Sequence, residues 1–289
     1  MTGPASGAVE DDFRDAAVVG LGLIGGSVAR DLLARGVRVR AFDPALVGAR
    51  MAPAHPLAGV RVVPALEELA GAELVVLATP VSATPALLAA LRPHLAAARL
   101  VVDVGSTKRS VVRAAGALGV GERFVGCHPL AGDHRSGWEA SREGLFRGAR
   151  VYLCATPGTA RGAVARAAGL WRSLGAHPVE MDAAEHDRLL AWTSHLPQSA
   201  ATALAVALAG AGIPPAALGP GGRDATRLAG SSPELWTAVA ADNADFLAEA
   251  LNALEARLAE LRACLAAGDV EATARFFGAG RAWFEQGPA

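Results

Sequence analysis

Three glycines stand at the spacing that lets a polypeptide turn pass close to a phosphate group. They are Gly20, Gly22 and Gly25, and they follow a short apolar run and open a stretch of helix-forming residues. The first allows a tight turn, the second lets the backbone approach a pyrophosphate, and the third lets the helix pack against the strand. The free N–H groups at the start of such a helix, around Leu23 and Ile24, favour negative charge. The pattern predicts a dinucleotide-binding turn.

An acidic residue, Asp43, closes the next apolar run 23 residues after Gly20. At this distance a carboxylate accepts hydrogen bonds from the hydroxyls of an adenosine ribose, and its charge repels a phosphate on that ribose. No arginine follows at residues 44–46. These observations predict NAD as the cofactor in preference to NADP. The alternative, an aspartate that only caps a turn before Pro44, leaves the spacing unexplained.

Polar groups stand where three further apolar runs end. Ligands of an open parallel sheet lie beyond the carboxyl ends of its strands, so we expect these segments to face the cofactor. The segments are Thr79-Pro80, Gly105-Ser106-Thr107-Lys108 and His128-Pro129-Leu130-Ala131-Gly132.

Two of these end residues have side chains suited to proton chemistry. The imidazole of His128 can take a proton from a hydroxyl while hydride leaves the same carbon, and Ser106 lies where it can assist. The alternatives are a structural histidine and a serine that caps a helix over residues 107–118.

Lys108 is the only lysine among 27 basic residues. We favour a role for it in organising the site over chance survival on a solvated helix face.

A second group of candidates lies later in the chain. His195 interrupts an uncharged stretch just before Pro197, which should open the helix near Thr193. A polar group in apolar surroundings needs a partner, and a substrate carboxylate would serve. Arg223 and Arg227 follow a glycine-rich turn; one can pair with Asp224 while the other clamps a carboxylate.

The elements that position these residues alternate along residues 16–157. Val-rich runs alternate with Ala- and Leu-rich stretches, the pattern of an α/β, doubly wound parallel sheet with helices on both faces. After Glu185 only long helices are expected. We predict a tail at 1–15, a dinucleotide-binding domain at 16–182 and a helical domain at 183–289. The expected strands are 16–20, 37–43, 60–63, 73–79, 100–104, 123–127, 150–155 and 177–181, with a helix over 159–174.

Composition narrows the partners. The 27 basic and 28 acidic residues are scattered, so we expect a small-molecule ligand, no nucleic acid and no membrane. Three cysteines without a CxxC pair argue against a disulfide framework and a metal site, and favour a cytoplasmic protein. Residues 189–222 carry no charge, but four prolines interrupt them, which favours a buried helix over a membrane span.

Leucines recur at spacings of four and three over residues 247–265, which predicts an apolar seam on one side of a helix. The seam must be covered, either within the domain or by a second subunit.

In this order and spacing, the motifs resemble the prephenate and arogenate dehydrogenases of tyrosine biosynthesis. The resemblance implies a Rossmann domain followed by an all-helical dimerisation domain. It also implies oxidative decarboxylation, in which hydride passes to NAD, carbon dioxide leaves and the substrate ring becomes aromatic. The motifs are residues 20–27, 103–108, 128–132, 194–197, 224–229 and 232–236.

The resemblance also implies roles for single residues. His128, helped by Ser106, would take or polarise the proton of the ring hydroxyl, while His195 and Arg227 would bind the anionic side of the substrate. Trp236 would shape the pocket wall, although a tryptophan at helical spacing is commonly a core residue. The resemblance assigns no role to Arg223.

Asp133 bears on the choice of substrate. Arogenate carries an ammonium group where prephenate carries a keto group, so an aspartate aimed at that group would favour arogenate. If Asp133 faces solvent or pairs with Arg135, this argument fails. We therefore expect prephenate as the substrate first, with arogenate or both substrates as the alternative. A different reductase with a helical domain and a non-catalytic NAD sensor are more distant alternatives.

Overall fold

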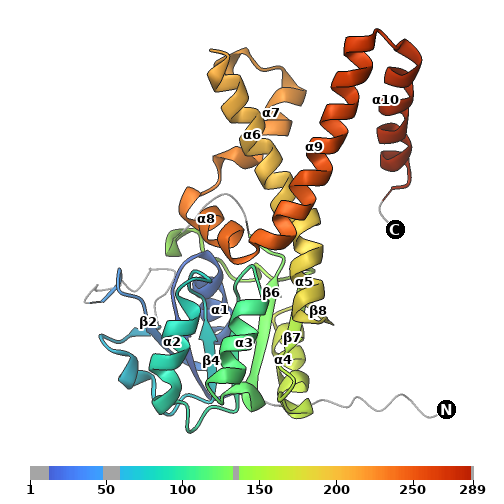
Figure 1. Ribbon diagram of the computed structural model, residues 1–289. Helices are drawn as coiled ribbons and strands as arrows, with labels where there is room; N and C mark the ends of the chain where they lie inside the picture. The colour runs from blue at the N-terminus through green and yellow to red at the C-terminus, as the bar shows by residue number, and fades with distance from the viewer. Residues whose placement is uncertain (1–12, 48–58, 133–136, 288–289) are drawn as a thin grey trace, which may run out of the picture.

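Eight short strands form one sheet in the first part of the chain (Figure 1). The structure, a computed structural model, describes residues 13–47, 59–132 and 137–287. The spatial order of the strands is β3-β2-β1-β4-β5-β6-β7-β8. All eight predicted strands are present, each within a few residues of its expected bounds. The strands are β1 (Asp15–Val19), β2 (Arg38–Phe42), β3 (Arg61–Val62), β4 (Leu74–Leu77), β5 (Leu100–Asp103), β6 (Phe124–Pro129), β7 (Arg150–Ala155) and β8 (His177–Glu180).

The sheet is mostly parallel, as the predicted fold class requires, but one pair of strands towards one edge is antiparallel. Strands β1 to β6 are parallel, but β7 pairs antiparallel with β6, with His128 opposite Tyr152, and β8 is parallel to β7. A parallel connection needs a crossover, usually a helix. The described part of the β6–β7 connection has only a short 3-10 turn, Trp138–Ala140. The chain therefore re-enters the sheet from the end at which β6 leaves it.

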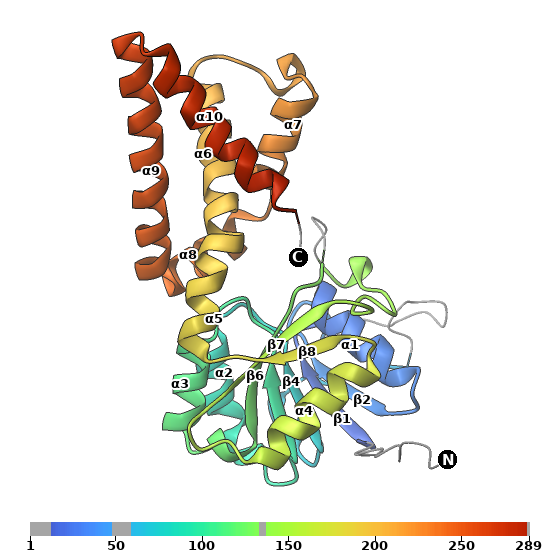
Figure 2. The same cartoon turned by 90° about the vertical axis from the view of Figure 1, so that its right-hand side faces the viewer.

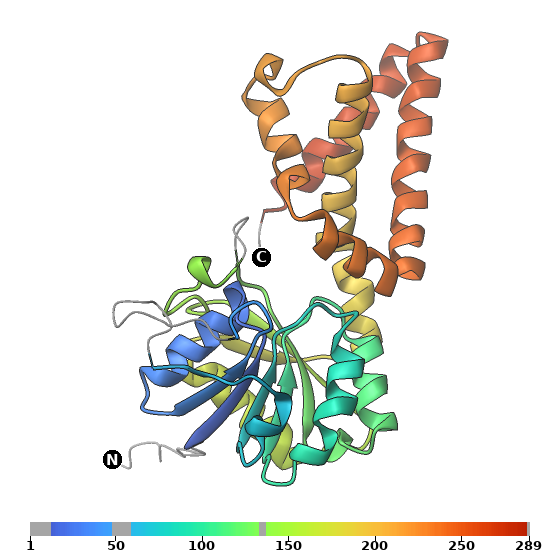
Figure 3. The same ribbon diagram turned by 90° about the vertical axis from the view of Figure 1, so that its left-hand side faces the viewer.

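Helices cover both faces of the sheet. Along β1, Val18 faces one layer, where it joins a core that includes Trp171, while Val19 faces the other layer with Leu88. This alternation follows from the two-residue period of a strand. Figures 2 and 3 show the two layers from opposite sides. The covering helices are α1 (Leu23–Leu33) and α4 (Arg161–Ser173) on the first face, and α2 (Thr84–Leu91) and α3 (Arg109–Ala117) on the second.

The second part of the chain is helical and stands over one end of the sheet domain; α9 rises away from that domain, and α10 turns back beside α9 (Figure 1). Within the described residues, no helix combines the length and apolarity needed to cross a bilayer. The helices are α5 (Ala183–Leu190), α6 (Leu196–Gly210), α7 (Pro220–Thr226), α8 (Pro233–Asp242), α9 (Ala244–Ala267) and α10 (Val270–Glu285).

Between α5 and α6 the helix widens into a π-helical turn, Ala191–His195. Pro197 has no N–H to donate to the preceding turn, and its ring displaces the carbonyl four residues earlier. The Thr193 hydroxyl donates to the Leu189 carbonyl at 2.9 Å. The predicted opening near Thr193 is therefore present, and it sets the direction in which His195 leaves the helix.

The leucine seam lies on α9, as predicted, but the chain itself covers only its start. Leu247 is buried, whereas Leu258 is 57% exposed and Leu265 is 62% exposed. Packing within the domain therefore accounts for the first turns of the seam and leaves the remainder on the surface.

Candidate functional site

The glycine turn has the backbone geometry that the sequence pattern predicts. Gly20 has φ +91°, and a Cβ atom there would lie 2.3 Å from the Ala78 carbonyl oxygen. A Cβ on Gly25 would lie 2.0 Å from the Gly20 oxygen, whereas a Cβ on Gly22 would meet nothing within 4 Å. No side chain caps the N-terminus of α1, which begins at Leu23. The turn thus presents open space and free N–H groups at one point, around Gly22.

Asp43 lies beside this turn at the end of β2. Its Oδ2 accepts the Leu21 N–H at 2.8 Å, and its Oδ1 accepts the Ala45 N–H at 2.9 Å. The turn-capping interpretation is therefore correct, but it is incomplete, since the same carboxylate also supports the glycine turn. An ionised carboxylate has about four acceptor positions. Asp43 can accept ribose hydroxyls while keeping both N–H partners.

Lys108 is fully buried under the carboxyl ends of the strands. Its ammonium contacts the Asp103 carboxylate and donates to the Cys127 carbonyl at 2.8 Å. Asp103 in turn accepts the Cys127 N–H at 3.3 Å. Burial raises the pKa of Asp103, and the Lys108 ammonium acts in the opposite direction. The ion pair therefore holds both backbone groups of Cys127, the residue before His128, so the single lysine is placed to position that histidine.

His128 is one end of a chain of three hydrogen-bonded side chains. Its Nδ1 lies 2.9 Å from Nε2 of His186, and Nδ1 of His186 lies 2.8 Å from Oδ1 of Asp187. His186 and Asp187 begin the second domain on α5 and are fully buried. The His186 ring also meets the ring of Tyr152 edge-on, with centroids 5.4 Å apart. Within the described residues, no protein group occupies Nε2 of His128.

Burial determines the charge state of these rings. It lowers the pKa of His128 well below 6.5, and the neighbouring His186 and Lys108 lower it further. Burial also lowers the pKa of His186, although the hydrogen bond to Asp187 opposes this change. For Asp187, burial acts to raise the pKa, but hydrogen bonds from His186 and two backbone N–H groups outweigh it and lower the pKa. At neutral pH the two rings are neutral and the carboxylate is ionised, which leaves His128 as a base.

His195 lies at the end of the π-helical turn and is only 1% exposed. Its Nδ1 is 3.1 Å from Nδ2 of Asn243, and its ring meets the Trp236 ring edge-on at 6.0 Å. Burial lowers the pKa of His195 to about 4, so this imidazole is also neutral at pH 7. The structure therefore brings His195 and Trp236 together, as the resemblance implies.

The two arginines that follow the glycine-rich turn behave differently. Arg223 donates to the Leu218 carbonyl at 2.6 Å, and neither arginine pairs with Asp224, contrary to expectation. Arg227 begins the turn after α7 and is exposed. That turn is anchored by Gln198, which donates to the Leu228 carbonyl at 2.8 Å. Gln198 lies one helical turn after His195, so α6 holds both His195 and the turn that begins at Arg227.

The remaining predicted residues lie at the strand ends or outside the described part. Thr79 shares a hydroxyl contact of 3.3 Å with Thr84, and Pro80 is exposed at the end of β4. The Ser106 hydroxyl does not cap α3, and it makes no hydrogen bond to the residues that the structure describes. Asp133 lies outside the described residues.

Arg109, at the start of α3, joins the two domains. Its guanidinium donates to Asp187 at 3.2 Å, to Asn243 at 2.9 Å and to Asp245 at 2.7 Å. It also lies over the Phe246 ring, 4.2 Å from the centroid. The sheet domain with His128 is thereby connected to the helical domain with His195.

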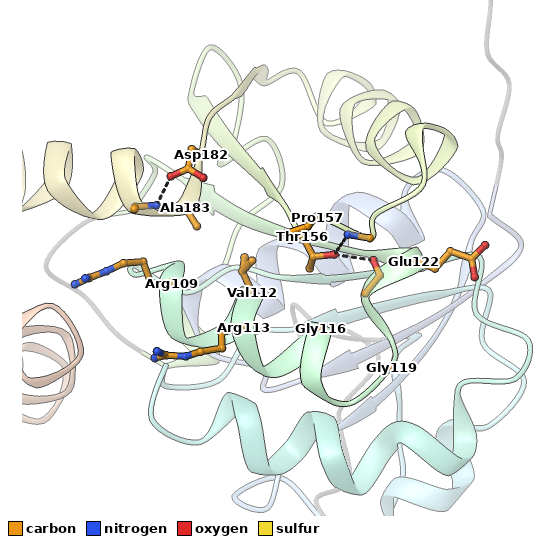
Figure 4. A pocket seen from close by; sticks show the side chains of 13 residues that line it. Arg109, Val112, Arg113, Gly116, Gly119, Glu122, Thr156, Pro157, Asp182 and Ala183 are labelled. Atoms are coloured by element: carbon orange, nitrogen blue, oxygen red, sulfur yellow. Dashed lines mark hydrogen bonds between the residues drawn. The ribbon is translucent and has the colours of Figure 1, made fainter.

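A hollow of about 670 Å³ lies between α3, the segment that follows β7 and the start of α5 (Figure 4). Its lining includes Arg113, Gly116, Thr156 and Asp182 but none of the predicted site residues. Because the lining contains neither His128 nor His195, we do not place the chemistry there.

Three functional candidates escaped the sequence reasoning: His186, Asp187 and Asn243. The adjacent histidine and aspartate near the start of a predicted helix were the available signal of a polar site, because residues of these types are rarely buried unless they have a polar partner. For Asn243, nothing in the local sequence distinguishes it from a helix cap.

The fold and the geometry at the strand ends are those of a dinucleotide-binding sheet domain followed by a helical domain, the arrangement expected of a dehydrogenase. Two family models match the chain: the nucleotide-binding domain of prephenate dehydrogenase over residues 33–180, and its dimerization domain over residues 182–279. The first match begins after the glycine turn, so the assignment of that turn depends on its own geometry.

Whole-length relatives agree with the models. The chain is 34% identical over 265 residues to a cyclohexadienyl dehydrogenase of Zymomonas mobilis, covering 89% of this chain and 90% of the relative. It is 33% identical over 281 residues to a prephenate dehydrogenase of Bacillus subtilis, covering 90% and 72%. The chain belongs to the prephenate dehydrogenase family.

Solved structures show the same architecture. Prephenate dehydrogenase of Aquifex aeolicus, in complex with hydroxyphenyl propionate and NAD+, superimposes with a TM-score of 0.84 at 25% identity, over 95% of this chain and 98% of that one. Arogenate dehydrogenase of Synechocystis gives 0.77 at 30% identity, over 94% and 99%. The predicted fold class, family, oxidoreductase activity and NAD cofactor are thereby confirmed, whereas the choice of substrate and the site residues remain predictions.

Proposed function

We propose that this chain catalyses the NAD-dependent oxidative decarboxylation of prephenate to 4-hydroxyphenylpyruvate in tyrosine biosynthesis. Membership of the family supports the reaction class. The observation that carries the proposal is His128, a neutral imidazole at a strand end whose Nδ1 lies 2.9 Å from His186 and whose Nε2 bonds to none of the residues that the structure describes.

The glycine turn fits the cofactor. Side chains at Gly20 and Gly25 would collide with backbone, while the space around Gly22 is open to a pyrophosphate. The N–H groups of Leu23 and Ile24 at the start of α1 would bind that group, and Asp43 would accept the ribose hydroxyls. Thr79, Pro80 and Ser106 would line the cofactor at the strand ends. Bound NAD supplies the hydride acceptor.

The protein residues supply the proton chemistry and the binding of the substrate. Nε2 of His128 accepts the proton of the ring hydroxyl as hydride leaves the same carbon, which leaves a carbonyl there. Loss of carbon dioxide from the opposite ring carbon returns an electron pair to the ring, and the resulting phenolate recovers a proton from His128. Ser106 hydrogen-bonds the same oxygen. Electrons and protons then balance with one NADH and one carbon dioxide formed.

The helical domain binds the anionic groups. A buried, neutral His195 can donate one hydrogen bond to a carboxylate, and Arg227 can add a charged, two-pronged contact. Trp236, edge-on to His195, would form the wall against the ring. A substrate carboxylate would thus be bound by the charge of Arg227 and the hydrogen bond of His195, while Trp236 would pack against the ring.

Arogenate is the second candidate substrate. One of the relatives is named a cyclohexadienyl dehydrogenase, and one solved neighbour is named an arogenate dehydrogenase. Both substrates share the ring, its hydroxyl and its carboxylate, so His128 and His195 would act alike on either. Discrimination would be made at the side chain, where Asp133 remains the candidate from the sequence.

The test is NADH formation by the purified protein with prephenate and arogenate side by side. We expect prephenate to be preferred and His128→Asn to lower turnover by about two to four powers of ten, the usual contribution of a general base. Asp133→Asn should reduce any activity with arogenate relative to prephenate. NADH from neither substrate would refute both candidates and favour a non-catalytic NAD-binding role.

We further infer a homodimer formed through the helical domain, in the cytoplasm. The support is the dimerization-domain match and the apolar surface of α9 and α10, where Leu258, Phe277 and Phe284 are 57%, 63% and 78% exposed. Apolar surface of this extent on a soluble chain marks an interface. Light scattering should give twice the chain mass, and Phe284→Glu should lower it while Val179→Glu, on the edge of the sheet domain, should not.

A further inference from the structure

The amide of Asn243 is held in one orientation by its neighbours. Its Oδ1 accepts from Arg109 at 2.9 Å, and its Nδ2 donates to the Asp187 carbonyl at 2.7 Å. A flipped amide would set a donor against the guanidinium and an acceptor against the carbonyl, so the observed orientation is the only satisfied one. The second N–H of the amide then faces Nδ1 of His195 at 3.1 Å. Nδ1 must accept it, which leaves the His195 proton on Nε2.

The carboxylate of Asp187 imposes the opposite result on His128. Asp187 receives the backbone N–H of Lys108 at 2.8 Å and that of Arg109 at 2.9 Å, in addition to Nδ1 of His186 at 2.8 Å. An ionised carboxylate only accepts, so the His186 proton lies on Nδ1. Nε2 of the neutral His186 ring is then an acceptor. His128 must donate from its Nδ1, which leaves its Nε2 without a proton.

Both chains of hydrogen bonds start from the same buried framework. Arg109 contacts both Asp187 and Asn243, and these two residues bond to each other through the Asp187 carbonyl. Asp187, His186 and Asn243 are fully buried, so water does not compete for these positions. The framework spans the junction of the two domains and reaches one histidine in each.

We propose that His186 and Asn243 are positioning residues that hold His128 and His195 in opposite tautomers, so that His128 presents an acceptor and His195 a donor to one substrate. The consequence for catalysis rests on the proposed function. A proton-accepting Nε2 is what a hydroxyl requires, and an Nε2–H is what a carboxylate requires. Two neutral imidazoles thus take different roles without a difference in charge.

The framework also gives the abstracted proton a place to go. Once His128 has taken the hydroxyl proton at Nε2, its Nδ1 proton can pass along the 2.9 Å contact to Nε2 of His186. The positive charge then lies against the Asp187 carboxylate instead of beside the substrate. The reverse transfer restores both rings when the phenolate recovers its proton, so the cycle is balanced.

The direct test is the tautomeric state of the histidines in the ligand-free protein at neutral pH, read from two-bond ¹H–¹⁵N correlation spectra. Signals are assigned with His128→Asn, His186→Phe and His195→Gln. We expect the proton on Nδ1 in His128 and His186, and on Nε2 in His195. The same tautomer in His128 and His195 would overturn the proposal. This measurement needs no substrate, so its outcome does not depend on whether the proposed function is correct.

Asn243→Asp tests the assignment by a nearly isosteric change, because a carboxylate at this position cannot donate to His195. We expect the His195 proton to move to Nδ1 and KM for the substrate to rise about 10- to 100-fold, the loss of a hydrogen bond to a charged group. The matched control is Asn252→Asp on the exposed side of α9, which should leave both measurements unchanged. A folded Asn243→Asp protein with an unchanged His195 signal would contradict the proposal.

His186→Phe tests the other half. It removes the acceptor for His128 while keeping a ring of similar size between His128 and Tyr152. We expect turnover to fall towards the about 10²- to 10⁴-fold loss of the whole base, with a much smaller change in KM. If KM alone changes, His186 does not act through His128.

Discussion

Lys108 offers a quantitative test of how the sheet domain holds His128. Its Nζ makes two buried contacts, with the Asp103 carboxylate and with the Cys127 carbonyl. Lys108→Met keeps the apolar stem and removes both. The carboxylate of Asp103, itself 1% exposed, would keep only the N–H groups of Gly105 and Cys127. Breaking a buried ion pair from one side costs about 3–5 kcal/mol, a large part of the about 5–15 kcal/mol that holds a typical domain together.

The assay is urea unfolding of the wild-type protein, Lys108→Met, and the double variant Lys108→Met with Asp103→Asn. We expect the single variant to lose about 3–5 kcal/mol and the double variant to regain most of it, because the neutral amide leaves no unpaired charge. A loss below about 1 kcal/mol in the single variant, or equal losses in the two variants, would refute the reasoning.

Because Lys108 is the only lysine, an amine-reactive label should modify the folded chain at its N-terminus alone and reach Lys108 only on unfolding.

Three further predictions follow from the site. Gly22→Ala should fold normally but raise KM for NAD about tenfold or more. Gly20→Ala should fail to fold, because the Cβ of an alanine at this position would lie 2.3 Å from a backbone oxygen. Thermal unfolding and NAD titration distinguish the two effects. Because burial lowers the pKa of His128 well below 6.5, kcat/KM should stay constant as the pH falls past 6.5 and should decline only at a pH well below that value. A decline centred above pH 6.5 would contradict a neutral base. The pKa of His195 is lowered to about 4, so below pH 6.5 the unfolded chain binds a proton at this ring that the folded chain does not bind. His195 alone should therefore lower the free energy of unfolding by about 3 kcal/mol between pH 6.5 and 4. His195→Gln should make the free energy of unfolding, measured with urea at each pH, less dependent on pH in this range. An unchanged pH dependence would show that the ring of His195 is not held neutral by burial.

The strands and the cofactor turn were predictable because their signals are local. Val-rich runs bounded by polar ends located all eight strands, and Gly20 and Gly25 stand where only a missing Cβ avoids a collision. The unusual single lysine drew attention to Lys108, which the structure buries beside Asp103 and Cys127, and its role in organising the site remains a prediction. Its partners, Asp103 and the Cys127 carbonyl, could not be predicted, because they lie on two different strands that only the folded sheet brings together.

The direction of β7 and the buried framework lay beyond the sequence for a related reason. β7 has the same apolar pattern as a parallel strand, and its antiparallel pairing depends on how the preceding connection returns to the sheet. His186, Asp187 and Asn243 act through contacts between α3, α5 and the start of α9, which are far apart along the chain. The pairing of one of the two arginines with Asp224 was plausible from their adjacency, but Arg223 donates to the Leu218 carbonyl instead.

We propose above all that His128, at the end of β6, removes the hydroxyl proton from prephenate while NAD is reduced. It is tested most directly by NADH formation with prephenate, measured for the wild-type protein and for His128→Asn with arogenate assayed in parallel. We expect wild-type turnover with prephenate as the better substrate and a loss of about 10²- to 10⁴-fold in the variant. Undiminished turnover in a folded His128→Asn protein, or no NADH from wild-type protein with either substrate, would contradict it.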